Sequence, residues 1–160
     1  MFSSNVDASA REVAIQLLAR REYSRAELAR KLQQKTFDAD EISACLDALA
    51  EQSLQSDARF AESFIRSRIS RGQGLIRIKG ELRQRGVDQE TQAAALAAVE
   101  EREAVDWFEL ARETLERRFS TPGDSPKERA KRERFLAARG FDFEQIIKCN
   151  FQFLSNIWNY

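Results

Sequence analysis

The sequence predicts an all-α protein of three tandem three-helix repeats, each of the helix-turn-helix sort. Only 6 Gly and 2 Pro occur among 160 residues, and the abundance of Ala, Leu, Arg, Glu and Gln favours helix throughout. No segment alternates β-branched residues with a period of two, so we expect no sheet. A pattern of apolar residues also recurs along the chain at intervals of about 50 residues, which indicates repeated supersecondary units.

Helix starts are marked by a short polar side chain followed three residues later by Glu or Gln. Such a pair predicts a capping box, in which the first side chain accepts a hydrogen bond from a free N–H of the first turn. The pairs are Ser9 with Glu12, Ser24 with Glu27, Asp38 with Glu41, Ser125 with Glu128, and Asp142 with Gln145. Pro126 at a first helical position strengthens the fourth. Gly72, Gly86 and Gly140 each follow a helical run, so we predict that each ends its helix with a backbone in the left-handed conformation.

The repeat is visible in the apolar positions. Raising the residue number by 50 aligns Leu28, Leu32, Phe37 and Leu46 with Ile78, Leu82, Val87 and Leu96. A weaker third copy, shifted by 104, aligns Leu136, Phe141 and Ile146 with Leu32, Phe37 and Ile42. We therefore expect an N-terminal tail over 1–8 and repeats over 9–55, 56–100 and 101–160, the last with an aromatic C-terminal tail. Units this small are marginal alone, so neighbouring copies should share packing.

Positive charge is concentrated in the second repeat. The chain has 26 basic and 26 acidic residues, yet 59–85 hold eight bases and two acids. A second basic cluster, 127–134, occupies the corresponding helix of the third repeat. Such clusters on helices are typical of proteins that bind a polyanion or an acidic protein surface. The predicted binding residues are Arg59, Arg66, Arg71, Arg77, Lys79, Arg83, Arg85, Arg129, Lys131 and Arg132. Arg68 lies closer to the apolar stripe, so an ion pair at the core edge is at least as good an interpretation for it.

Composition argues against an enzyme. The chain has no His, which removes Ser-His and Cys-His catalysis and the commonest zinc ligand. We find no activated nucleophile, Gly-rich nucleotide loop or metal-binding pattern, so we expect no catalytic residues, cofactor or metal. Cys45 and Cys149 are far apart and are interpreted as reduced, buried hydrophobes. Without a signal peptide or membrane-length apolar run, we predict a cytoplasmic monomer with no membrane partner.

The segment Ser56–Val87 resembles the RecX family, bacterial regulators of the RecA recombinase. The residues that carry the resemblance are Asp57, Arg59-Phe60-Ala61, Arg66, Arg68, Gly72, Gly74, Ile78, Glu81-Leu82 and Gly86-Val87. The first repeat also matches, at Leu18, Arg20, Ser24, Glu27-Leu28 and Leu32, as does Arg139-Gly140-Phe141 near the end. The resemblance extends from about residue 10 to residue 147.

The resemblance implies a curved, elongated helical array that binds along RecA filaments on single-stranded DNA. In that family, binding blocks filament extension or promotes disassembly, and so lowers ATPase, strand exchange and co-protease activity, modulating DNA repair and the SOS response. Direct contact with single-stranded DNA would be weak and salt-sensitive. The aromatic tail 150–160 departs from the family pattern, and we expect it to pack on the third core, with Trp158 capping that core; the alternative is a contact with another chain. The alternatives are a stand-alone helix-turn-helix DNA-binding protein and a helical-repeat adaptor for another acidic protein.

Overall fold

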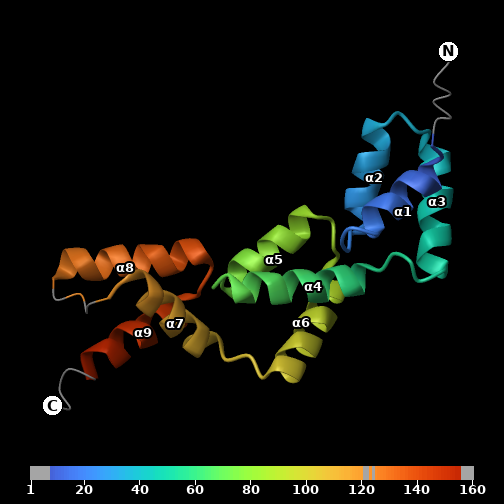
Figure 1. The fold of residues 1–160 in the computed structure, drawn as a ribbon. Coiled ribbons are helices and arrows are strands. Elements are labelled where there is room, and N and C mark those ends of the chain that lie inside the picture. Colours follow the sequence, from blue (N-terminus) through green and yellow to red (C-terminus); the bar gives the residue numbers. More distant parts are fainter. Residues whose placement is uncertain (1–7, 121–122, 124, 156–160) are drawn as a thin grey trace. The chain divides into compact units, whose positions relative to one another are not determined.

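The computed structural model describes residues 8–120, 123 and 125–155, and these form helices with no strands (Figure 1). The helices are α1 (Ala10–Leu18), α2 (Arg25–Gln34), α3 (Ala39–Glu51), α4 (Asp57–Ser70), α5 (Leu75–Gln84), α6 (Gln89–Glu103), α7 (Trp107–Arg118), α8 (Pro126–Arg139) and α9 (Phe143–Ser155). The all-α prediction is confirmed for this part of the chain.

Most of the predicted caps are present. The Ser24 hydroxyl accepts from the Glu27 N–H at 3.1 Å, and the Ser24 N–H donates to the Glu27 carboxylate at 3.0 Å. Asp142 and Gln145 form the same reciprocal pair, and Ser9 and Ser125 accept from the expected N–H groups. The prediction for Asp38 is wrong in one respect, because its side chain makes no cap hydrogen bond. This helix end is exposed, and water can satisfy its first N–H groups instead.

The predicted helix-ending glycines have the expected backbone conformation. Gly72, Gly86 and Gly140 have φ angles of 73°, 78° and 97°, which side-chain-bearing residues rarely adopt. Each ends its helix in a tight turn, and the chain then enters the next helix within a few residues.

The structure divides into two compact units: Met1–Ser63 with Leu82–Ala95, and Phe64–Glu81 with Leu96–Tyr160. Helices α4, α5 and α6 therefore each contribute residues to both units. In the first unit, α1, α2 and α3 enclose a core that includes Leu28, Leu32, Ile42 and Leu46. These are repeat positions identified from the sequence, and all four are buried.

The second unit contains the core between α7, α8 and α9. Its buried residues are Ala111, Leu115, Leu136, Phe141, Ile146 and Cys149. The three residues that define the third sequence copy are thus core residues. Ile78, Leu82 and Val87 of the second copy are buried as well. Most of the recurring apolar positions are therefore core positions, whereas Phe37 and Leu96 are half-buried.

A joint between neighbouring repeats occurs within each unit, and the two joints resemble one another. In the first unit the Ser24 hydroxyl donates to the Arg85 carbonyl at 2.7 Å. In the second unit the N–H of Gly74, which is equivalent to Ser24, donates to the Arg139 carbonyl at 2.8 Å. Arg85 and Arg139 each precede a left-handed glycine. At each joint, the start of the second helix of one repeat lies against the turn that ends the second helix of the following repeat.

Candidate functional site

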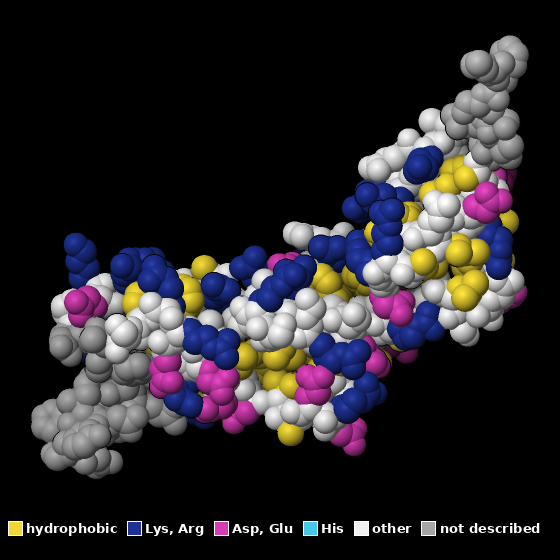
Figure 2. Space-filling view, in the orientation of Figure 1, with side chains coloured by type: hydrophobic (Ala, Val, Ile, Leu, Met, Phe, Trp, Pro, Cys, Tyr) yellow, Lys and Arg dark blue, Asp and Glu magenta, His cyan; other side chains and the backbone are white. Residues whose placement is uncertain are grey.

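The basic side chains belong to both units, and Figure 2 shows many of them gathered over α8. Arg59, Arg83 and Arg85 lie in the first unit, and the other predicted binding residues lie in the second. The contacts of each side chain show which ones are free to bind a partner.

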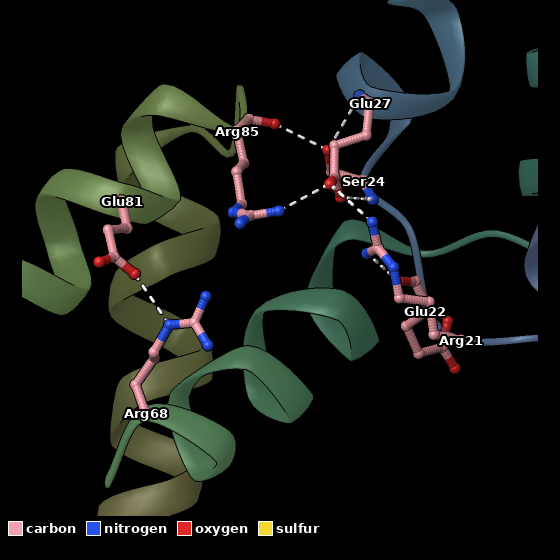
Figure 3. Close-up of polar contacts among 7 residues, drawn as sticks. All are labelled: Arg21, Glu22, Ser24, Glu27, Arg68, Glu81 and Arg85. Atoms are coloured by element: carbon pink, nitrogen blue, oxygen red, sulfur yellow. Dashed lines mark hydrogen bonds and ion pairs between the residues drawn. The ribbon is translucent and has the colours of Figure 1, made fainter. Parts of the chain in front are cut away.

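Two of the three predicted binding residues in the first unit form ion pairs. Arg59 contacts the Glu22 carboxylate at 3.2 Å and donates to the Ser53 carbonyl at 2.7 Å. Arg85 contacts the Glu27 carboxylate at 2.8 Å (Figure 3). Both therefore help to hold the second repeat against the first. Arg83 is exposed and has no carboxylate partner among the residues that the structure describes.

Glu27 is the centre of the network that holds Arg85. Its carboxylate also receives the Ser24 N–H at 3.0 Å and the Arg21 guanidinium at 3.2 Å, as Figure 3 shows. Burial raises the pKa of Glu27, but the Ser24 N–H and the guanidinium groups of Arg21 and Arg85 outweigh burial, so that the pKa lies below its ordinary value. The carboxylate is charged at neutral pH, and Arg85 serves mainly to balance it.

In the second unit, Glu81 joins two arginines from different helices. Arg68 contacts it at 2.8 Å and Arg77 at 3.0 Å. The Arg68 guanidinium also lies over the Phe64 ring, at 4.2 Å from its centre. Burial raises the pKa of Glu81, but hydrogen bonds from Arg68 and Arg77 outweigh it, and the pKa is lowered overall. Arg68 thus has the structural role that its place near the apolar stripe suggested.

Arg132 does not lie on the surface where the sequence analysis placed it. The residue is 7% exposed, and its guanidinium lies 5.0 Å from the centre of the Phe119 ring. The shift of 104 that defines the third copy aligns Arg132 with Leu28, which is fully buried. The burial of Arg132 could therefore have been predicted from the repeat. Its neighbours Arg129 and Lys131 on α8 are exposed.

Six predicted binding residues are exposed and have no carboxylate partner in the described part of the chain. They are Arg66, Arg71, Lys79, Arg83, Arg129 and Lys131. We call them the free basic residues. Their positive charge is balanced by no neighbouring acid, so they are the side chains that can contact an anionic partner without first breaking an ion pair.

Three arginines that the sequence analysis did not select line a cavity in the second unit together with Arg71. They are Arg117, Arg118 and Arg139. Two signals could have identified them. The stretch 117–139 holds eight bases and three acids, and Arg139 precedes a helix-ending glycine as Arg85 does.

Other kinds of site find no support in the residues that the structure describes. No group of three or more His, Cys, Asp or Glu side chains in 8–120, 123 and 125–155 is arranged to hold a metal ion. None of the helices there is both long and apolar enough to cross a membrane. The predicted contact of Trp158 with the third core lies outside the described residues.

The helical repeats, their polar joints and the free basic residues define a tandem-repeat helical protein with exposed, unpaired basic side chains. Models of the three RecX three-helix domains match residues 10–49, 56–96 and 104–149 in order. The regulatory protein RecX of Chromohalobacter salexigens is 57% identical over 143 residues, which cover 89% of this chain and 91% of that protein. The chain belongs to the RecX family.

Further relatives and solved structures agree with this assignment. The regulatory protein RecX of Halorhodospira halophila is 45% identical over 138 residues, covering 85% of this chain and 83% of the relative. The crystal structure of RecX from Lactobacillus salivarius shares the fold, with a TM-score of 0.73 over 90% of this chain and 94% of that one. At 23% identity, this likeness shows the fold alone.

Proposed function

We propose that this protein binds RecA filaments assembled on single-stranded DNA and inhibits the recombinase without catalysing a reaction. Inhibition would extend to filament growth, ATPase, strand exchange and co-protease activity, and so modulate DNA repair and the SOS response in the cytoplasm. Membership of the RecX family supports this proposal, as does the name "regulatory protein" that its relatives carry. We further propose that the protein acts as a monomer.

The free basic residues carry the proposal. They stand out in a chain whose net charge is zero, and no acidic side chain in the described residues neutralises them. A recombinase filament offers DNA phosphates and acidic protein side chains along its length. Exposed guanidinium and ammonium groups bind both, and their attraction falls off within about 10 Å at moderate ionic strength, so they must approach the filament closely.

The test is the single-stranded-DNA-dependent ATPase of the cognate RecA, with this protein titrated from far below to equal stoichiometry. The variant Arg66→Glu/Lys79→Glu/Arg83→Glu reverses three free basic residues. The matched control is Arg30→Glu/Lys31→Glu/Lys35→Glu, which makes the same change of net charge. Its three residues are exposed; Arg30 and Lys31 lie in α2, and Lys35 follows it.

We expect the wild type and the control to inhibit at low stoichiometry, and the first variant to need at least about tenfold more protein. Circular dichroism and melting should show that all three are folded. Full inhibition by the first variant would mean that the surface is wrongly placed. Absence of inhibition by the folded wild type would contradict the proposed function itself.

The strongest alternative, a stand-alone reader of duplex DNA, predicts a different result. It requires sequence-specific binding to duplex DNA at physiological salt without any recombinase. A binding selection from random duplexes distinguishes the two, because a filament regulator would enrich no sequence.

A further inference from the structure

The second unit contains a cavity whose lining is strongly basic. The turn after α4, the second half of α7 and the second half of α8 border this cavity, which is open to solvent and has a volume of about 190 Å³. Arg71 comes from the turn, Arg117 and Arg118 from α7, and Arg139 from the end of α8. No Asp or Glu lines it. Four arginines from three segments of the chain thus line one small space.

Unlike Arg68, Arg77 and Arg112 of the same unit, these four arginines are not neutralised by an ion pair in the part of the chain that the structure describes. Arg68 and Arg77 share the carboxylate of Glu81, whereas Arg71, Arg117, Arg118 and Arg139 have no carboxylate partner among the described residues. Like charges held close together repel one another. An anion bound between them would remove this repulsion and make charge-assisted hydrogen bonds.

Parts of the cavity wall are held in place before any ligand binds. The Arg139 guanidinium donates to the Arg71 carbonyl at 3.2 Å and lies over the Phe135 ring, at 5.2 Å from its centre. The turn after α4 packs closely against α7: a Cβ added to Gly72 would lie only 2.7 Å from the Thr114 hydroxyl oxygen. That hydroxyl in turn donates to the Leu110 carbonyl at 2.7 Å. The Arg139 guanidinium and the backbone of the turn therefore need little further ordering, which favours affinity.

The chemistry of the lining identifies the kind of anion. A guanidinium group presents paired donors that match the oxygens of a phosphoryl group, and arginine is the preferred residue for such contacts. Four positive charges around a space of this size exceed the charge of a single carboxylate or phosphodiester. We propose that the cavity is a phosphate-binding site for a ligand with two or more neighbouring phosphoryl groups.

Two sources could supply such a ligand: the pyrophosphate part of a nucleotide, or consecutive phosphates of a single-stranded nucleic acid. The site goes beyond the proposed function, because it requires no recombinase. It also uses three arginines outside the free basic residues.

The experiment measures binding to the isolated full-length protein at about 50 mM NaCl, where phosphate contacts are strong. The probes are pyrophosphate, ATP and a fluorescent oligo(dT), with citrate as an anion of similar charge that lacks phosphoryl groups. The variant is Arg117→Gln/Arg118→Gln. The control, Arg30→Gln/Lys31→Gln, removes the same charge from exposed residues of α2 in the first unit.

We expect at least one phosphate probe to bind the wild type and the control at least about tenfold more tightly than the variant, with citrate weaker than that probe. Pyrophosphate or ATP that binds and displaces oligo(dT) identifies a nucleotide-type ligand. Variant-sensitive binding of oligo(dT) alone identifies the strand backbone. Equal affinity of variant and control for every probe, or citrate binding as tightly as the phosphate probes, overturns the proposal.

Two further measurements separate a true negative from a folding defect. Melting without ligand checks that the variant is folded, as the exposed positions of Arg117 and Arg118 lead us to expect. Amide chemical shifts of the wild type, titrated with pyrophosphate, should change at Gly72 and Thr114. Unchanged shifts at both residues would also contradict the site. Because no recombinase is present, these results bear on the cavity and not on the proposed function.

Discussion

Glu27 shows how one carboxylate decides which arginines remain available for binding. It holds both Arg21 and Arg85, and it accepts the Ser24 N–H. Glu27→Gln keeps an acceptor for that N–H but removes the negative charge. Since both guanidinium groups are partly exposed, we expect a loss of about 1–2 kcal/mol in the free energy of unfolding at pH 7, measured by urea denaturation.

The pH dependence provides a control for this variant. The pKa of Glu27 is lower in the folded protein than in the unfolded chain, because the Ser24 N–H and two guanidinium groups outweigh burial. The stabilisation is therefore complete above the unfolded pKa and is lost as the pH falls through the folded pKa. The difference between wild type and Glu27→Gln should shrink from pH 7 to about pH 4 and below. A constant difference would show that the charge of Glu27 is not its cause.

The two cysteines should be poorly reactive thiols. Burial raises the pKa of Cys149 to about 11 and also raises the pKa of Cys45. At pH 8 both are protonated, and Cys149 is only 1% exposed. We expect Cys45 to react slowly with a disulfide reagent and Cys149 to react only in denaturant, as mass spectrometry of labelled peptides can show. Rapid labelling of Cys149 in buffer would contradict its burial.

Individual arginine roles could be predicted from the sequence only in part. Arg68 was recognisable because its own helix places it beside the apolar stripe. Arg59 and Arg85 were not, because their partners Glu22 and Glu27 lie 37 and 58 residues away. A cluster of basic residues in the sequence suggests that each is free to bind a partner. The fold, however, places a carboxylate beside Arg59 and another beside Arg85.

At the scale of the element, α5 contains one glycine and is preceded by another, and the two have opposite expected effects. A Cβ on Gly74, just before the helix, would lie 2.4 Å from the backbone of Gly140, whereas a Cβ on Gly80 would contact nothing within 4 Å. Gly74→Ala should cost about 2–3 kcal/mol in the free energy of unfolding, because it forces the joint apart. Gly80→Ala should add about 0.5–1 kcal/mol, because alanine favours the helix interior.

Thermal and urea unfolding of both variants test this joint. The two substitutions add the same methyl group within one segment, so each is the control for the other. Equal stabilities would mean that Gly74 is not held against the Gly140 turn.

Helix caps and ends were predictable because they depend on residues within about four positions of one another. Ser24 and Gly140 illustrate this. The joints were not predictable in the same way, since the Ser24 hydroxyl meets a carbonyl 61 residues further along the chain. The sequence indicated only that neighbouring copies should share packing.

Across the whole molecule, the repeat was the strongest sequence signal, because it depends on many positions at once. Its three copies correspond to the matches with three RecX domains. The repeat also contained information that charge counting overlooked, namely the alignment of Arg132 with Leu28. The convergence of the cavity arginines could not be predicted from the sequence, because it depends on contact between the turn after α4 and α7.

The zero net charge leads to a prediction about salt. A neutral protein gains little from long-range attraction, so the proposed binding to single-stranded DNA depends on close contacts by unpaired basic side chains, the free basic residues among them. Each phosphate neutralised on a single strand contributes about 0.7 to the slope of log affinity against log salt. Arg66→Glu/Lys79→Glu/Arg83→Glu should therefore flatten the slope by about two, whereas Arg30→Glu/Lys31→Glu/Lys35→Glu should leave it unchanged. Fluorescence anisotropy with oligo(dT) between about 50 and 200 mM NaCl measures both slopes. An affinity that does not change with salt would mean that apolar contacts, rather than these basic side chains, hold the strand.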